Sequence, residues 1–342
     1  LLASSAASDV YKRQEVECRA KEGKHINTIK EDLEALVDKR LHWTLLTLPI
    51  LGIVIFTILP LVFMICMAFT SYSKVGDHLT IFHWVGLKNF STVLGMGNSI
   101  GKTFWSVLGW TLIWAVLATF LNYILGMILA IVINRKTTRI KGFWRFCFML
   151  SAAIPQFVSL LLMRTMLKDN GLINNLLVQA GLISSPLPFL TNATWARATV
   201  VIINLWVGIP FTMMQVTGIL QNIPGELYEA ARVDGAGPVT IFFKITLPYM
   251  LFVTTPYLIT TFTGNINNFN VIYLLTAGAP VPVGATAGKT DLLVTWLYKL
   301  TVDLQYFNVG AVVGILTFVI LAVVSLITYR NTGSYKNEEG FQ

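Results

Sequence analysis

Residues 103–134 read TFWSVLGWTLIWAVLATFLNYILGMILAIVIN and contain no charged side chain. A helix that crosses about 30 Å of hydrocarbon needs roughly 20 apolar residues. This stretch is long enough to do so, and it predicts that lipid is the solvent of this part of the chain.

The composition extends that prediction to most of the protein. The 342 residues are 55% hydrophobic and only 12% charged, whereas roughly a quarter of an ordinary soluble domain is charged. Of the 25 Lys and Arg and the 17 Asp and Glu, 16 fall within residues 1–40. This pattern excludes a disordered chain, a collagen-like fibre and a disulfide-stapled secreted module.

Uncharged windows of at least 18 residues predict six membrane spans. They are residues 41–73, 103–134, 146–163, 198–225, 245–275 and 304–329. Residues 170–196 are also uncharged, but they contain four Asn and a Ser-Ser-Pro-Leu-Pro run. Such breakers are not tolerated facing lipid, so this segment is predicted to form loops or short interfacial helices.

The distribution of Lys and Arg predicts the orientation. If both termini are cytoplasmic, 17 of the 25 Lys and Arg lie on the inner side and eight on the outer side. Cytoplasmic loops carry the excess of these residues, so both ends are expected inside. The net charge of +8 then reflects this bias and the anionic inner leaflet, and no nucleic-acid partner is expected.

The predicted organisation has four parts. Residues 1–14 are Ser/Ala-rich and lack an initiator Met, and we expect an artefactual or non-native segment. Residues 15–42 are expected to form a cytoplasmic helix or tail, residues 43–330 the transmembrane domain, and residues 331–342 a cytoplasmic tail.

The loop between the fourth and fifth spans carries the strongest motif. Residues 229–235 read EAARVDG and residues 245–248 read ITLP. Pro224 is expected to open a short helix, with Glu226 and Glu229 in the first turn, where the helix dipole favours anions, and Gly235 is expected to close it with a left-handed cap. Such a helix is too short to span. It serves either to bind a partner or only to connect two spans.

This pattern resembles a known signature. Glu-Ala-Ala, three residues, Gly, nine residues and Ile-x-Leu-Pro is the signature loop of ATP-binding-cassette (ABC) importer permeases, and it matches from Glu229 to Pro248. Four further segments resemble the maltose/maltodextrin branch of that family: GMILAIVINR (126–135), KGFWR (141–145), NLWVGIP (204–210) and NNFNVIYLLT (267–276). The resemblance implies an all-α type I importer permease of the bacterial cell membrane, with six transmembrane helices.

In that family the signature loop is a coupling helix that docks in a cleft of a cytoplasmic ATPase. The resemblance implies that the coupling residues are Glu229, Ala230, Ala231, Asp234 and Gly235. It also implies a second homologous permease, two copies of the ATPase, an extracytoplasmic solute-binding protein and a sugar substrate. The enteric-type maltose permease has additional N-terminal helices and an extracytoplasmic domain, whereas here only residues 74–102 separate the first two spans.

ATP is not expected to bind to this chain, which is predicted not to be an enzyme and to need no cofactor or metal. A phosphate-cradling loop requires Gly, four residues and Gly-Lys-Ser/Thr. At Gly288-Lys289-Thr290, Val283 stands where the first Gly is required. ATP hydrolysis must therefore come from a partner.

Neutral amides and aromatic rings inside the spans suit a neutral polyhydroxylated ligand, since an amide both donates to and accepts from hydroxyls. The residues that fall in the segments where maltose-type permeases contact sugar are Asn204, Trp206, Gly208, Phe211, Asn267 and Asn270. The alternative is that the Asn residues only tie helices together and that Trp206 faces lipid. Gly208 and Pro210 are expected to loosen the fourth span.

The sequence is compatible with three functions. The favoured one is the permease subunit of a sugar importer, with maltose, maltodextrin or a related oligosaccharide as substrate. An ion-coupled secondary transporter would need titratable groups in its spans, and the six windows contain no Asp or Glu, although sodium could still use carbonyls. A scaffold without transport activity is the third. In the last outer loop, Asp291, Lys299 and Asp303 are expected to be solvated or to contact a solute-binding protein.

Overall fold

The computed structural model describes residues 12–14, 41, 43, 45–73, 83–135 and 137–330. The segments expected at residues 1–14, 15–42 and 331–342 therefore lie almost entirely outside the described residues. The chain divides into two compact units, Leu1–Met64 and Ile65–Gln342, and each unit is described by itself.

The described part of the first unit is an apolar helix. It begins at Leu45, passes through a π-helical turn, η1 (Val54–Ile58), and continues as α3 (Leu59–Ala68), whose last residues belong to the second unit. Its 24 residues are long and apolar enough to cross a membrane, which confirms the first predicted span. Leu48 and Phe56 are exposed, as expected of a helix solvated by lipid.

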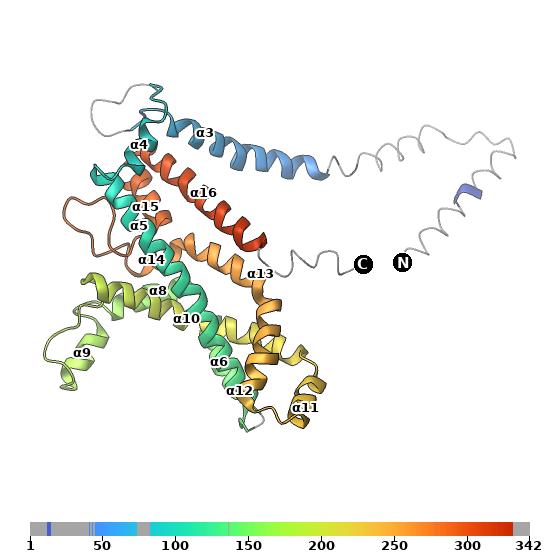
Figure 1. Ribbon diagram of the computed structural model, residues 1–342. Helices are drawn as coiled ribbons and strands as arrows, with labels where there is room; N and C mark the ends of the chain where they lie inside the picture. The colour runs from blue at the N-terminus through green and yellow to red at the C-terminus, as the bar shows by residue number, and fades with distance from the viewer. Residues whose placement is uncertain are drawn as a thin grey trace. The chain divides into compact units, whose positions relative to one another are not determined.

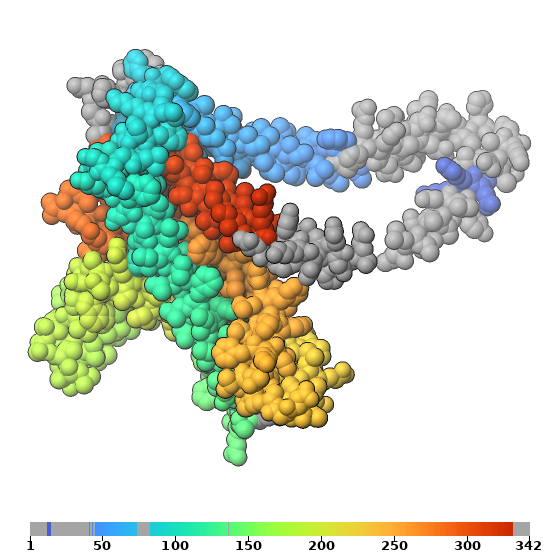
Figure 2. Space-filling view, in the orientation of Figure 1, coloured from blue at the N-terminus to red at the C-terminus, as the bar shows by residue number. Residues whose placement is uncertain are grey.

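The regular elements among the described residues of the second unit are all helices, joined by loops (Figure 1). Its first long membrane helix consists of α5 (Ser99–Val116), η2 (Leu117–Leu121) and α6 (Asn122–Asn134), which follow one another without a break. A second continuous helix consists of α12 (Pro238–Ile241), η3 (Phe242–Thr246) and α13 (Leu247–Ile266). The other membrane helices are α7 (Lys141–Ala153), α8 (Gln156–Met166), α10 (Ala193–Asn222) and α16 (Phe307–Arg330). The shorter elements are α4 (Lys88–Leu94), α9 (Leu172–Gln179), α11 (Gly225–Val233), α14 (Phe269–Leu275), α15 (Leu293–Tyr298) and η4 (Lys299–Asp303). Figure 2 shows α11 and α12, in yellow and orange, at the same end of this unit as the last turn of α6, in green.

The predicted third span is bent. The helices α7 and α8 form an angle of 84°, so the six-span count holds if this bent pair is taken as one span. Pro155 explains the bend, because it lacks an amide hydrogen and disfavours helical geometry at the residue before it. Ile154 accordingly has an extended backbone, with φ −77° and ψ 127°.

The predicted fifth span is displaced along the sequence. The helix starts at Pro238 and ends at Ile266, whereas the uncharged window covered residues 245–275. Lys244 limited that window, but a lysine at the end of a membrane helix can extend its ammonium group to the interface. At the other end, the side-chain oxygen of Asn268 accepts a hydrogen bond from the Val271 amide and starts the separate helix α14.

Helix α10 organises the packing of the second unit. Toward its start, Val200 belongs to a buried cluster with Trp114 of α5. Toward its end, Met213 belongs to a second cluster with Met127 of α6. The α6 and α10 backbones approach closely at Gly126, where an added Cβ would lie 2.7 Å from the Thr212 side chain. Small residues permit this approach, as is usual between helices in lipid.

An ion pair stabilises the last loop that the sequence placed on the outer side. Asp291 has no exposed surface, and one of its carboxylate oxygens lies 2.6 Å from the Lys299 ammonium group. The same carboxylate accepts hydrogen bonds from the Gly288 amide and the Thr295 hydroxyl. The expectation that Asp291 and Lys299 are solvated is therefore wrong for this pair, whereas Asp303 is exposed. The cost of burying the Asp291 carboxylate is offset because its oxygens have partners.

The α6–α10 contact predicts the effect of one added methyl group. Gly126→Ala should force the two helices apart and lower the midpoint of thermal unfolding, because overpacking costs about 1–3 kcal/mol. Gly109→Ala is the matched control, since a Cβ at Gly109 of α5 meets no atom within 4 Å. Thermal unfolding of the detergent-solubilised protein measures both variants, and an unchanged midpoint for Gly126→Ala would contradict the tight contact.

Candidate functional site

The motif loop folds as the short helix α11. Pro224 precedes its first residue, and Gly235 has a φ of +75°, which confirms the predicted left-handed cap. The Asp234 amide donates to the Ala230 carbonyl at 3.0 Å, so the last turn is closed by the backbone. Glu226 lies in the first turn as predicted. Glu229, the fifth residue of the helix, lies in the second turn, so its expected place in the first turn is wrong.

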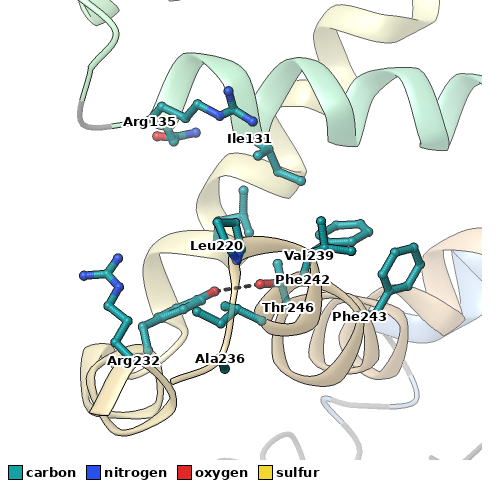
Figure 3. A pocket seen from close by; sticks show the side chains of 13 residues that line it. Ile131, Arg135, Leu220, Arg232, Ala236, Val239, Phe242, Phe243 and Thr246 are labelled. Atoms are coloured by element: carbon teal, nitrogen blue, oxygen red, sulfur yellow. Dashed lines mark hydrogen bonds between the residues drawn. The ribbon is translucent and has the colours of Figure 1, made fainter. Parts of the chain in front are cut away.

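One hydrogen bond fastens α11 to the membrane helices. The Tyr228 hydroxyl lies 3.2 Å from the Thr246 hydroxyl of η3, as the dashed line in Figure 3 shows. This contact turns Tyr228 inward and leaves Glu229 and Ala230 exposed, with Ala231 half-buried. Asp234 and Gly235 are exposed as well. The predicted coupling residues therefore form a surface that a partner can reach.

Polar side chains from three helices meet at the middle of α10. The Thr212 hydroxyl donates a hydrogen bond to the side-chain oxygen (Oδ1) of Asn122 in α6, at 3.0 Å. It also lies 3.5 Å from the Tyr257 hydroxyl of α13. An added Cβ at Gly208 would lie 2.0 Å from the Asn122 amide nitrogen, so glycine is required for this approach. We call Asn122, Gly208, Thr212 and Tyr257 the polar layer.

Three members of the polar layer were missed by the sequence reasoning. Asn122 carried a signal, because it is the only amide side chain within residues 103–133, and a polar side chain in a span usually faces the bundle interior. Thr212 and Tyr257 carried none, since threonine and tyrosine are frequent in membrane helices for other reasons.

The predicted sugar residues of α10 are only partly brought together. Positions 204, 208 and 211 share one face of the helix, whereas position 206 lies on the opposite side. Asn204 is only 8% exposed, and no hydrogen-bond partner for its amide is found in the described part of the chain. Trp206 and Phe211 are exposed.

The predicted loosening at Pro210 is not observed, because α10 is an uninterrupted helix. Pro210 has no amide hydrogen, so the Trp206 carbonyl lacks its helical donor. Pro210 and the neighbouring Met213 are both buried, and this packing holds the helix together on either side of the missing hydrogen bond.

The Asn residues at the end of α13 and just after it divide into two groups. Asn265 is buried and donates to the Thr119 hydroxyl at 3.0 Å, so it ties two helices together, as the alternative interpretation predicted. Asn267 and Asn270 are exposed, and among the described residues no partner is found for either amide. Their predicted role in sugar contact stays a prediction.

No group of three or more His, Cys, Asp or Glu that could hold a metal ion occurs among the described residues.

The comparisons with known proteins define the class. Residues 122–332 match the family described as the binding-protein-dependent transport system inner membrane component. The galactooligosaccharides transport system permease protein GanP of Bacillus subtilis is 36% identical over 93% of this chain and 76% of the relative. The maltodextrin transport system permease protein MdxF of the same organism is 36% identical over 93% of this chain and 75% of the relative.

Two further comparisons bear on length and fold. The maltose/maltodextrin transport system permease protein MalF of Escherichia coli is 35% identical over 72% of this chain and 49% of that relative. A solved bacterial alginate ABC transporter, in complex with an alginate pentasaccharide-bound periplasmic protein, matches 89% of this chain and 96% of the solved chain with a TM-score of 0.69 at 22% identity. This last likeness shows the fold alone.

The protein is a membrane permease component and not an enzyme. In particular, the chain belongs to the family of binding-protein-dependent transport system inner membrane components.

The cap of α11 yields a test of the local geometry. Gly235→Ala should speed hydrogen exchange of the Asp234 and Ala236 amides about tenfold, because a left-handed backbone costs a residue with a Cβ roughly 1–2 kcal/mol. Gly237→Ala is the matched control, since Gly237 has a φ of −74° and a Cβ there meets no atom within 4 Å. Equal exchange in the two variants would contradict the cap.

Proposed function

We propose that this chain is the transmembrane subunit of an ABC importer that moves an oligosaccharide, maltodextrin or a related sugar, into the cytoplasm. The observation that carries the proposal is the polar layer at the middle of α10, which offers amide and hydroxyl groups but no charge. Such groups suit an uncharged ligand with many hydroxyls. The names of the relatives, which transport galactooligosaccharides and maltodextrin, support the same class of substrate.

The proposed sugar path follows the α10 face that carries Asn204, Gly208 and Phe211. The unpaired amide of Asn204 would serve as a hydrogen-bonding group, and the Phe211 ring would pack on the sugar, whereas Trp206, on the opposite side of α10, would not line this part of the path. Asn267 and Asn270 would contribute from α13 and α14, since both of these helices contact α10. The polar layer would form the floor of this path.

The proposed complex contains a second homologous permease, two copies of an ABC ATPase and an extracytoplasmic solute-binding protein. The family description, which names a binding-protein-dependent system, supports the last of these. Both termini would lie in the cytoplasm, in agreement with the distribution of Lys and Arg. The α11 helix would then dock on the ATPase with Glu229, Ala230, Ala231, Asp234 and Gly235.

The proposed mechanism is alternating access driven by the partner. ATP binding would close the ATPase dimer, displace α11 and convert the sugar path from inward-open to outward-open. After hydrolysis the inward-open state would return and release sugar. This chain contributes the path and the coupling surface, while the free energy comes from the ATPase.

Reconstitution tests the function and the coupling surface together. Vesicles that contain the whole complex should import labelled maltodextrin only with ATP and the solute-binding protein present. Glu229→Gln should lower this import at least tenfold, because it removes the charge at the docking surface, whereas Glu226→Gln, one turn away on the same helix, should change it less than twofold. Gradient-driven uptake by the chain without an ATPase would contradict the function. Equal import by the two variants would contradict only the role of Glu229.

Asn204 tests the sugar path. Asn204→Leu should raise the sugar concentration for half-maximal transport up to about tenfold, since a hydrogen bond contributes roughly 0.5–1.5 kcal/mol. It should not lower thermal stability, because the amide has no partner to lose within the described chain. Asn175→Leu, at an exposed position of α9, is the control. Dissociation of the complex in Asn204→Leu would show that this amide instead ties the two permeases together.

A further inference from the structure

A cavity of about 720 Å³ lies between α11 and the ends of the membrane helices. Its walls come from the last turns of α6 and α10, from α11 and from the α12–η3 segment (Figure 3). The cavity lies behind the exposed surface of Glu229 and Ala230, since Tyr228, which points away from that surface, forms part of its lining. It is therefore separate from the proposed coupling surface and from the polar layer.

Two cations line this cavity. Arg135 ends α6, and Arg232 lies in the last turn of α11. In the described part of the chain no carboxylate lies within 4 Å of either guanidinium group, and neither group has a hydrogen-bond acceptor, although Glu229 and Asp234 lie on the same segment as Arg232. Two unpaired guanidinium groups in one cavity are suited to an anion that offers several oxygens, such as a phosphate group.

Apart from Asn134 and the hydrogen-bonded pair Tyr228 and Thr246, the rest of the lining is apolar, and part of it is exposed. Val239 and Phe243 are 69% and 59% exposed, and the Phe243 ring packs edge-on against Phe242 at 5.0 Å. In Figure 3 Arg232 and Phe243 lie on opposite sides of the cavity. A free phosphate ion would leave the apolar side without a partner, whereas an amphiphile with an anionic head group would satisfy both sides.

The position of the cavity identifies the amphiphile. It lies where the long membrane helix Ser99–Asn134 ends and where the membrane helix Pro238–Ile266 begins, and so at the ends of two membrane helices rather than between their middles. Arg139, in the loop that follows α6, and Lys141, the first residue of α7, add positive charge at this end. Basic pockets between membrane helices on the cytoplasmic side of a membrane bind anionic lipid head groups.

We propose that this cavity binds the head group of an anionic phospholipid. Arg135 and Arg232, on two walls of the cavity, supply the positive charge that attracts the head group, and Val239, Phe242 and Phe243 contact the first part of the acyl chains. The lipid lies between α11 and the membrane helices, so it supports the position of the coupling helix from behind. The inference depends on the membrane location of the chain and not on the identity of the sugar.

Native mass spectrometry of the assembled complex tests this site. The complex is titrated with a short-chain phosphatidylglycerol and, separately, with the matching phosphatidylcholine. Phosphatidylglycerol should bind more tightly, and the double variant Arg135→Gln/Arg232→Gln should weaken its binding roughly thirtyfold. The double variant Arg139→Gln/Lys244→Gln is the matched control, because it removes the same charge at the same end from residues that do not line the cavity.

Four results would overturn the proposal. If both double variants weakened phosphatidylglycerol binding equally, the lipid would be attracted to a basic surface in general. Equal affinity for the two lipids would show that the cavity does not distinguish between their head groups. Displacement of the lipid by millimolar inorganic phosphate would identify a free anion as the ligand. Loss of the ATPase from the Arg135→Gln/Arg232→Gln complex, but not from the control, would assign the cavity to a protein interface.

Discussion

The close contact between α6 and α10 is the interaction on which the second unit depends. Between helices in lipid the hydrophobic effect supplies little attraction, so association rests on tight packing and on hydrogen bonds. Gly126 and Gly208 permit both, since the first lets the backbones approach and the second makes room for the Asn122 amide. The two buried clusters then extend along α10 on either side of this contact, and α5, α8 and α13 pack on them.

A polar side chain within the hydrocarbon needs a partner, and this requirement separates structural from functional amides. Asn134 donates to Thr217 and accepts from Arg145, which joins α6, α10 and α7. Asn265 joins α13 to η2 in the same way. Asn204 is as well buried as Asn265 but has no partner in the described chain. The hydrogen-bonding groups of an amide in that position need water, a second permease or a ligand as partner. For this reason we place Asn204 in the proposed sugar path.

The sequence predicted what depends on local composition and missed what depends on distant contacts. Charge-free windows located the spans because a charge is costly in lipid wherever the helix lies, and Gly235 predicted its own cap because a positive φ is a local property. The ends of the fifth span were wrong, because Lys244 can reach the interface and Asn268 starts a new helix. The burial of Asp291 could not be predicted, because it requires that the loop fold back to bring Lys299 and the Gly288 amide to one carboxylate. The polar layer likewise depends on the contact of three helices that are far apart in the sequence.

The connections of α11 explain how a partner on its exposed side can act on the polar layer. On one side α11 follows α10, a continuous helix that carries Gly208 and Thr212. On the other side the hydrogen bond from Tyr228 to Thr246 joins α11 to η3, which runs without a break into α13 and Tyr257. Two of the three helices that form the polar layer, α10 and α13, are therefore connected to α11. The third, α6, faces α11 across the cavity lined by Arg135 and Arg232. In the proposed mechanism a displacement of α11 would therefore act on α10 and α13, and through them on the hydrogen bond between Thr212 and Asn122. An occupant of the cavity, which lies between α11 and α6, would limit this displacement.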